Sequence, residues 1–189
     1  MLIGYAGGGT RNIFATKSFA TMAEMKGLKV RVQGAPIWSR TFNAVGMAPT
    51  VIAYNEVYNA IQNGVIQAGE NEAAGVEAMK FYEVGKFLNV TQHAITIRPI
   101  CFSAKTFKTL PADLQAAIIK AGKEAGKYGR DIESSEDQAK LDALAKANKL
   151  TLVPFKERAA MQKAVDPVMM TYAKEIGADG IFARINAIK

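Results

Sequence analysis

The most informative polar residue of the sequence is an arginine in a short apolar segment. Arg31 lies in Leu28-Lys29-Val30-Arg31-Val32-Gln33-Gly34, where apolar and polar side chains alternate with the period of a β-strand. This pattern predicts a strand that presents Arg31 on its open face. A guanidinium held on a strand binds a carboxylate through two parallel hydrogen bonds, a geometry that lysine does not reproduce. The segment therefore indicates either an anion-binding arginine or an ordinary solvated one.

Residues that support catalysis are scarce. His93 is the only histidine, and no serine with a nearby base, no metal-spaced Cys/His cluster and no nucleophile elbow accompanies it. Gly7-Gly8-Gly9 permits a sharp turn or a close approach to a ligand, but the residues that complete a phosphate-binding loop do not follow. We therefore expect no catalytic residue, no metal site and no cofactor.

Composition and charge narrow the class of protein. The chain of 189 residues is 49% hydrophobic and 22% charged, which is typical of a globular protein that buries a core without disulfides or metal. No apolar run approaches the roughly 20 residues of a membrane-spanning helix. The net charge is +7, but the lysines are interleaved with Glu and Asp along amphipathic segments, so binding to nucleic acid is not expected.

Two further features concern the cysteine and the start of the chain. Cys101, the only cysteine, lies in the apolar run Ile100-Cys101-Phe102 and is predicted to be a small buried side chain without a partner. No signal peptide is recognised, because no cationic start precedes an apolar stretch and a cleavage site. The chain opens on a short apolar piece at residues 2–5, as if in mid-strand, so we expect either an intracellular protein or one whose beginning is missing.

The first half of the sequence predicts alternating strands and helices. The predicted strands are 28–32, 49–52 and 65–68, and the predicted helices are 37–45, 56–63 and 72–79, with Asn71 as a candidate N-cap. This alternation is typical of an α/β sheet with parallel strands.

The second half changes character. Residues 87–91 and 94–102 predict two longer strands of a crossing segment, followed by a helical stretch from Leu110 toward Asn148 that is long enough to span two lobes. Gly122, Gly126 and Gly129 weaken this helix and favour a bend. A strand at 150–153, a helix at 156–176 broken or kinked near Pro167, and a last short helix to residue 188 complete the prediction.

Several motifs occur together in a distinctive order. They are Gly9-Thr10-Arg11, Met25-Lys26-Gly27-Leu28-Lys29-Val30-Arg31-Val32, Gly46-Met47-Ala48-Pro49-Thr50, Glu56-Val57-Tyr58, Gly69-Glu70-Asn71, Phe81-Tyr82-Glu83-Val84, His93 and Leu110-Pro111-Ala112-Asp113-Leu114-Gln115. With these motifs the sequence resembles, over nearly the whole chain, the periplasmic solute-binding subunits of TRAP transporters, of the DctP type. The resemblance implies an α/β fold like that of type II periplasmic binding proteins. It also implies capture of a small organic carboxylate, without chemistry, and its delivery to membrane permease subunits.

The same resemblance assigns roles to individual residues. Arg31 becomes the arginine that clamps the ligand carboxylate, and Arg11 lies near the same anion, unless it is a loop arginine that pairs with a neighbouring acid. Asn71 reaches the ligand with its amide, serves as the N-cap, or does both. Glu70 and His93 form the polar back of the pocket.

Two aromatic residues follow the predicted clamp strand. Trp38 and Tyr54 either stack against the apolar part of a ligand or pack in the core, and the family pattern favours the ligand for Tyr54. An α/β enzyme acting on a carboxylate, with His93 or Glu70 as its base, is the weaker alternative function.

The resemblance also bears on domain organisation. In the family a signal peptide and a first lobe lie ahead of the point where this chain starts, so the resemblance implies the second lobe, a connecting helix and a remnant of the first. We expect residues 1–95 to form the first part of the ligand-binding lobe, 96–136 the crossing strands and long helix with the remnant of the other lobe, and 137–189 the return. Uncovered apolar surface then favours an oligomer or strand exchange. A fragment that folds but binds nothing is the alternative.

Overall fold

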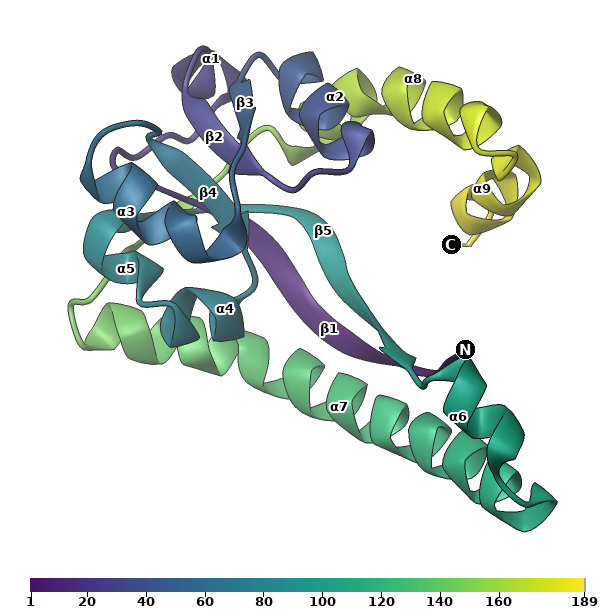
Figure 1. The fold of residues 1–189 in the computed structure, drawn as a ribbon. Helices are drawn as coiled ribbons and strands as arrows, with labels where there is room; N and C mark the ends of the chain where they lie inside the picture. Colours follow the sequence, from purple (N-terminus) through teal and green to yellow (C-terminus); the bar gives the residue numbers. More distant parts are fainter. Residues whose placement is uncertain (189) are drawn as a thin grey trace.

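One mixed six-stranded sheet organises the protein, in the computed structural model that describes residues 1–188. The strand order is β3-β2-β4-β1-β5-β6 (Figure 1). Strand β2 pairs in parallel with β3 and β4, whereas β1 runs antiparallel to β4 and β5, and β6 is parallel to β5. In chain order the strands are β1 (Leu2–Ala15), β2 (Lys29–Val32), β3 (Ala48–Val51), β4 (Ala68–Asn71), β5 (Phe87–Cys101) and β6 (Thr151–Pro154).

The helices connect these strands and cover both faces of the sheet (Figure 1). They are α1 (Met22–Met25), α2 (Pro36–Ala44), α3 (Val57–Gln62), α4 (Ala73–Ala78), α5 (Phe81–Val84), α6 (Ala104–Thr109), α7 (Ala112–Lys146), α8 (Arg158–Glu175) and α9 (Asp179–Asn186), and a 3₁₀ turn at Tyr54–Glu56 precedes α3. Within residues 1–188, no helix combines the length and the apolar character needed to cross a bilayer.

Successive residues of β1 serve two separate hydrophobic cores. Ile13 belongs to the core that also contains Val30, Phe42 and Met161, whereas Phe14 belongs to the one formed with α3, α4, α5 and α7. Adjacent strand residues point to opposite faces, so each face of the sheet has its own core. The predicted α/β architecture is therefore confirmed.

The long helix α7 lies against the ribbon formed by β1 and β5, which extends beyond the two cores (Figure 1). A Cβ on Gly126 would lie 2.5 Å from the Tyr5 carbonyl oxygen, and one on Gly122 would lie 2.7 Å from the Ile3 oxygen. These glycines allow the strand to touch the helix backbone. The predicted helix is found as one continuous element, and Gly122 and Gly126 serve this contact.

Two predictions about strands are wrong in detail. The predicted strand 65–68 is found three residues later, because the N–H groups of Val65 and Ile66 donate to the Ala60 carbonyl and close helix α3. Glu70 and Asn71 are therefore strand residues. The two strands predicted at 87–91 and 94–102 form one strand, β5, which passes through Gln92 with a positive φ of 47°.

Three further expectations need correction. The glycine run Gly7-Gly8-Gly9 lies within β1 and forms no turn, although Gly7 and Gly8 have positive φ values at an irregularity of the pairing with β5. Helix α8 is not broken at Pro167, which lies inside it, and Met161 and Ala173 are buried on either side of the proline; a kink there stays a prediction. Cys101 is exposed, because it ends β5 in the part of the ribbon that lies beyond both cores.

Apolar side chains are exposed along the ribbon. Tyr5, Ile95 and Ile97 are 50%, 65% and 72% exposed, respectively. Exposed apolar surface of this kind was expected from the sequence, whereas an oligomer or strand exchange stays a prediction.

Candidate functional site

Arg31 is buried in strand β2, although the alternation of the strand placed it on an open face. Only 7% of the residue is exposed. Its Nε donates to the carbonyl oxygen of Ile52 at 2.9 Å, and no acidic side chain of residues 1–188 forms an ion pair with it. Burial lowers the pKa of the guanidinium, and the nearby charge of Arg11 adds to this, while Glu70 opposes it. A desolvated guanidinium without a counter-ion is costly, so the position suits an anion supplied from outside.

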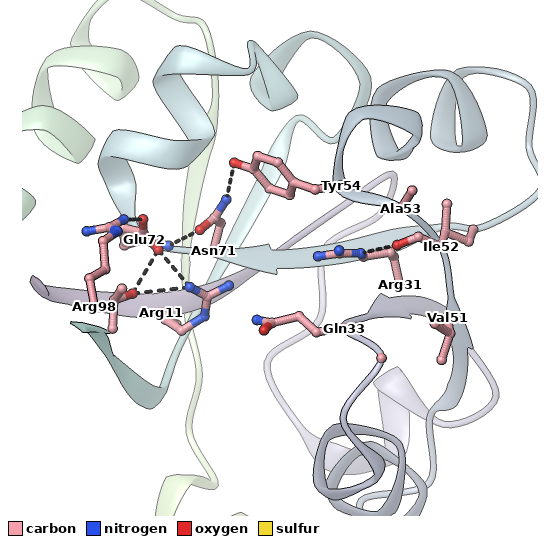
Figure 2. A pocket seen from close by; sticks show the side chains of 12 residues that line it. Arg11, Arg31, Gln33, Val51, Ile52, Ala53, Tyr54, Asn71, Glu72 and Arg98 are labelled. Carbon is pink, nitrogen blue, oxygen red and sulfur yellow. Dashed lines mark hydrogen bonds and ion pairs between the residues drawn. The ribbon is translucent and has the colours of Figure 1, made fainter. Parts of the chain in front are cut away.

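A cavity of about 530 Å³ opens beside Arg31. Tyr54 and Asn71 line it, and the Asn71 Nδ2 donates to the Tyr54 hydroxyl oxygen at 2.8 Å (Figure 2). The Tyr54 ring centroid lies 5.5 Å from the guanidinium carbon of Arg31, which places a π face against the cation. Asn71 is not the N-cap of α4; that position belongs to Glu72, whose N–H donates to the Asn71 Oδ1 at 3.0 Å.

Arg11 lines the same cavity but already has acidic partners. Its Nε and Nη2 donate to the two carboxylate oxygens of Glu70 at 2.5 and 2.9 Å, and its Nη1 donates to Glu72 at 2.8 Å. Burial works against the charge of Arg11, but the hydrogen bond and charge of Glu70 outweigh it, so its pKa is raised. Arg11 and Arg31 therefore differ in charge compensation, because the charge of Arg11 is neutralised by acidic side chains of the protein.

Glu70 and His93 form a layer behind Arg11. The Glu70 side chain is fully buried, and the His93 Nε2 lies 3.4 Å from its Oε2. Burial alone would raise the pKa of Glu70, but hydrogen bonds from His93 and Arg11 reverse this and lower it. His93 does not line the Arg31 cavity; it lines a second one of about 300 Å³, beside Arg158 and Asp166 of helix α8.

Trp38 also lies outside the Arg31 cavity. Its ring packs against Phe42, with centroids 6.5 Å apart, and lies 5.7 Å from the guanidinium carbon of Arg11. The structure thus brings together Arg31, Arg11, Asn71 and Tyr54 around one cavity and places Glu70 behind Arg11. Trp38 packs against the core, as one of its two predicted roles required, and His93 lines the second cavity.

Four polar residues of the cavity were missed by the sequence analysis: Gln33, Glu72, Thr96 and Arg98. The Thr96 hydroxyl donates to Glu72 Oε2 at 2.8 Å, and Arg98 pairs with both Glu72 and Glu133. A signal was present, since Thr96 and Arg98 alternate with Ile95 and Ile97 and so share one strand face. Among residues 1–188, no cluster of His, Cys, Asp and Glu has the arrangement of a metal site.

The sequence matches one known family over most of its length. Residues 1–175 match the family described as bacterial extracellular solute-binding protein, family 7, or DctP. The chain belongs to this family. The resemblance drawn from the motifs is thereby confirmed, and the family is one of solute-binding proteins of transport systems.

Individual relatives agree with this assignment. A solute-binding protein from Sulfitobacter sp. (strain NAS-14.1) is 51% identical over 186 residues, which are 98% of this chain and 56% of the relative. The C4-dicarboxylate-binding periplasmic protein DctP of Rhodobacter capsulatus is 32% identical over 83% of this chain and 48% of its own length. The chain thus spans about half the length of the curated relatives it matches.

Solved structures share the fold. A TRAP periplasmic solute-binding protein from Sulfitobacter sp. NAS-14.1 with bound α-D-taluronate matches with a TM-score of 0.95 and 51% identity, over 97% of this chain and 60% of that protein. One from Bradyrhizobium sp. BTAi1, in complex with α/β-D-galacturonate, matches with a TM-score of 0.91 and 29% identity, over 98% and 62% of the two chains. The predicted fold class, that of TRAP periplasmic binding proteins, is confirmed.

Proposed function

We propose that this chain carries the carboxylate-binding part of an extracytoplasmic solute-binding protein of a TRAP transporter. In this role it captures a small organic acid in the periplasm and delivers it to membrane permease subunits. The observation that carries the proposal is Arg31, a buried guanidinium that lines a cavity and has no acidic partner among residues 1–188. Its terminal nitrogens match the two oxygens of one carboxylate.

The surroundings of Arg31 support its role as the clamp. Tyr54 and Asn71 are joined by a hydrogen bond next to it, so both side chains are held in place before a ligand arrives. We propose that Asn71 binds the ligand with its amide and that Tyr54 covers its apolar side. Arg11, held by Glu70, contributes positive potential near the anion, and Glu70 and His93 act as its support.

Capture without chemistry is favoured by the state of the two candidate bases. The Glu70 side chain is fully buried, and the His93 side chain is only 5% exposed. They are engaged with each other, and neither lines the Arg31 cavity, although His93 lines the second cavity. A general base must reach the proton that it removes from a substrate, so this placement supports binding and argues against turnover.

The division of the chain supports the same proposal. We propose that residues 1–95 and 137–189 build the ligand-binding lobe and that 96–136 form the crossing strands and the long connecting helix, with a remnant of the other lobe. In support, strand β6 returns to pair with β5 at Phe87–Val90, next to the core, whereas α6 and most of the ribbon extend away from it (Figure 1).

A thermal-shift screen of the 189-residue chain against small organic acids tests the proposal. Uronates, malate and succinate represent the acids to compare. An acid that binds the folded chain alone raises its melting temperature, by an amount equivalent to about 2.7 kcal/mol at 100 times the dissociation constant. We expect at least one acid to give this shift and Arg31→Ala to abolish it. If no acid shifts the melting temperature, this chain is a fragment that folds without binding and the proposal is wrong for it.

A further inference from the structure

The arginines that line the Arg31 cavity differ in whether an acidic side chain pairs with them. Arg11 is neutralised by Glu70 and Glu72, and Arg98 pairs with Glu72 and Glu133. Arg31 alone, among the arginines that line this cavity, has no acidic partner within residues 1–188. The cavity wall therefore offers one free positive charge, which suffices for one carboxylate.

Glu72 is the acidic residue that lines this cavity. It is 3% exposed and accepts three hydrogen bonds: one from Arg11 and one from Thr96 at Oε2, and one from Arg98 at Oε1. A carboxylate has about four acceptor positions, so one position at Oε1 is left. That position accepts a ligand hydroxyl, whereas a second ligand carboxylate would face a negative charge.

The other polar groups of the wall are neutral. Gln33, Tyr54 and Asn71 present amide and hydroxyl groups to the cavity (Figure 2), and Thr96, which also lines it, has a hydroxyl group. Such groups exchange hydrogen bonds with hydroxyls at no cost in charge. A second ligand carboxylate would need a second free cation. Arg98 could provide it only by breaking its ion pair with Glu72 or with Glu133.

From this arrangement we infer that the site selects acids with a single carboxylate and several hydroxyl groups over dicarboxylates, and that Glu72 makes the distinction. The inference rests on the proposed function, because it assumes that Arg31 holds the carboxylate. It separates two ligand chemistries found among the relatives, the sugar acid of the Sulfitobacter protein and the C4-dicarboxylate of the Rhodobacter protein. Like charges brought together in a desolvated site cost several kcal/mol, enough to decide between them.

The test compares two acids of one carbon skeleton by isothermal titration of the 189-residue chain. D-Galacturonate has one carboxylate, and galactarate has a second one in place of the anomeric carbon. We expect galacturonate to bind at least about tenfold more tightly than galactarate. In Glu72→Gln the ratio falls to about threefold or less, because the amide no longer repels the second carboxylate. Glu124→Gln on helix α7, where Glu124 is exposed and pairs with Lys120, makes the same change in net charge and keeps the ratio.

The outcomes separate the two proposals. Equal affinity for the two acids overturns the selectivity while leaving carboxylate binding in place. A preference for galacturonate that is unchanged in Glu72→Gln removes Glu72 from its role. Binding of neither acid, nor of any other acid in the thermal-shift screen, overturns the proposed function itself. The comparison on the unmodified chain needs no variant, so it decides the selectivity even if Glu72→Gln folds poorly.

Discussion

The Nε of Arg31 donates to the backbone carbonyl oxygen of Ile52 at 2.9 Å (Figure 2). This bond fixes the guanidinium, and its two terminal nitrogens have no hydrogen-bond partner among residues 1–188. Arg11, which lines the same cavity, has all three side-chain nitrogens bound to acceptors. Two buried arginines of one cavity thus differ in their partners: Arg11 is bound by Glu70 and Glu72, whereas Arg31 has no acidic partner among residues 1–188, as a proposed carboxylate-binding residue requires.

The same substitution at these two arginines should change the free energy of unfolding by very different amounts. Arg31→Met replaces a desolvated cation with an apolar chain of similar length, so we expect the free energy of unfolding to stay within about 1 kcal/mol. Arg11→Met leaves Glu70 and Glu72 buried without this partner and should cost about 3–5 kcal/mol. Urea unfolding of both variants without ligand measures this, and an equal loss in both would contradict the difference.

Glu70 should make the protein sensitive to acid. Its pKa is lowered in the folded state, so its stabilising effect is complete above its unfolded pKa, about 4.3, and is lost as the pH falls through the folded value. Glu70→Gln should cost about 3–5 kcal/mol at pH 7. Its remaining stability should then fall less steeply below pH 5. Exposed Glu77 provides the control, since Glu77→Gln should leave both quantities nearly unchanged.

Asp137 of helix α7 should help to position Arg11 and Glu72, because it binds the backbone next to each of them. Its two carboxylate oxygens accept hydrogen bonds from the N–H of Thr10 and the N–H of Ala73, both at 3.1 Å, next to Arg11 and Glu72. Asp137→Asn keeps one acceptor and loses the other, so we expect carboxylate binding to weaken and stability to fall by about 1–3 kcal/mol. Asp142→Asn, on the exposed side of the same helix, should change neither. Unaltered binding in Asp137→Asn would exclude this role.

The contact between Gly126 and Tyr5 should be intolerant of a methyl group. A Cβ at Gly126 would lie 2.5 Å from the Tyr5 carbonyl oxygen, so Gly126→Ala should separate β1 from α7 and cost about 1–3 kcal/mol. At Gly180 of helix α9 a Cβ meets nothing within 4 Å, and Gly180→Ala should be neutral or stabilise by about 0.5 kcal/mol. Thermal unfolding followed by circular dichroism compares them. A stabilising Gly126→Ala would show that the strand and helix can separate freely.

Local sequence patterns predicted most helices and strands, but not the contacts between residues that lie far apart in the sequence. The alternation around Arg31 identified strand β2, and the apolar stripe identified α7, because both depend on neighbouring residues. The pairing of Arg11 with Glu70 joins residues 59 apart in the sequence, and no local pattern reveals it. The glycines of α7 suggested a bend, because their partner, strand β1, lies more than 100 residues earlier.

The candidate site shows the same limit. The family motifs pointed to Arg31, Arg11 and Asn71, which all line one cavity. They passed over Glu72 and Arg98, because the importance of these residues comes from the ion pair between Glu72, at the start of α4, and Arg98 of β5, and not from a motif. Trp38 and His93 lie near those motifs in sequence, but Trp38 packs against the core beside Phe42, and His93 lines the second cavity.

Calorimetric titration of D-galacturonate into the unmodified chain and into Arg31→Lys tests the central claim most directly. Lysine keeps the charge and loses the fork of donors, so affinity should fall at least tenfold, or about 1.4 kcal/mol. Lys29→Gln, an exposed residue of the same strand, provides the control and should bind as the unmodified chain does. If Arg31→Lys binds galacturonate as tightly as the unmodified chain, the guanidinium of Arg31 is not the carboxylate clamp.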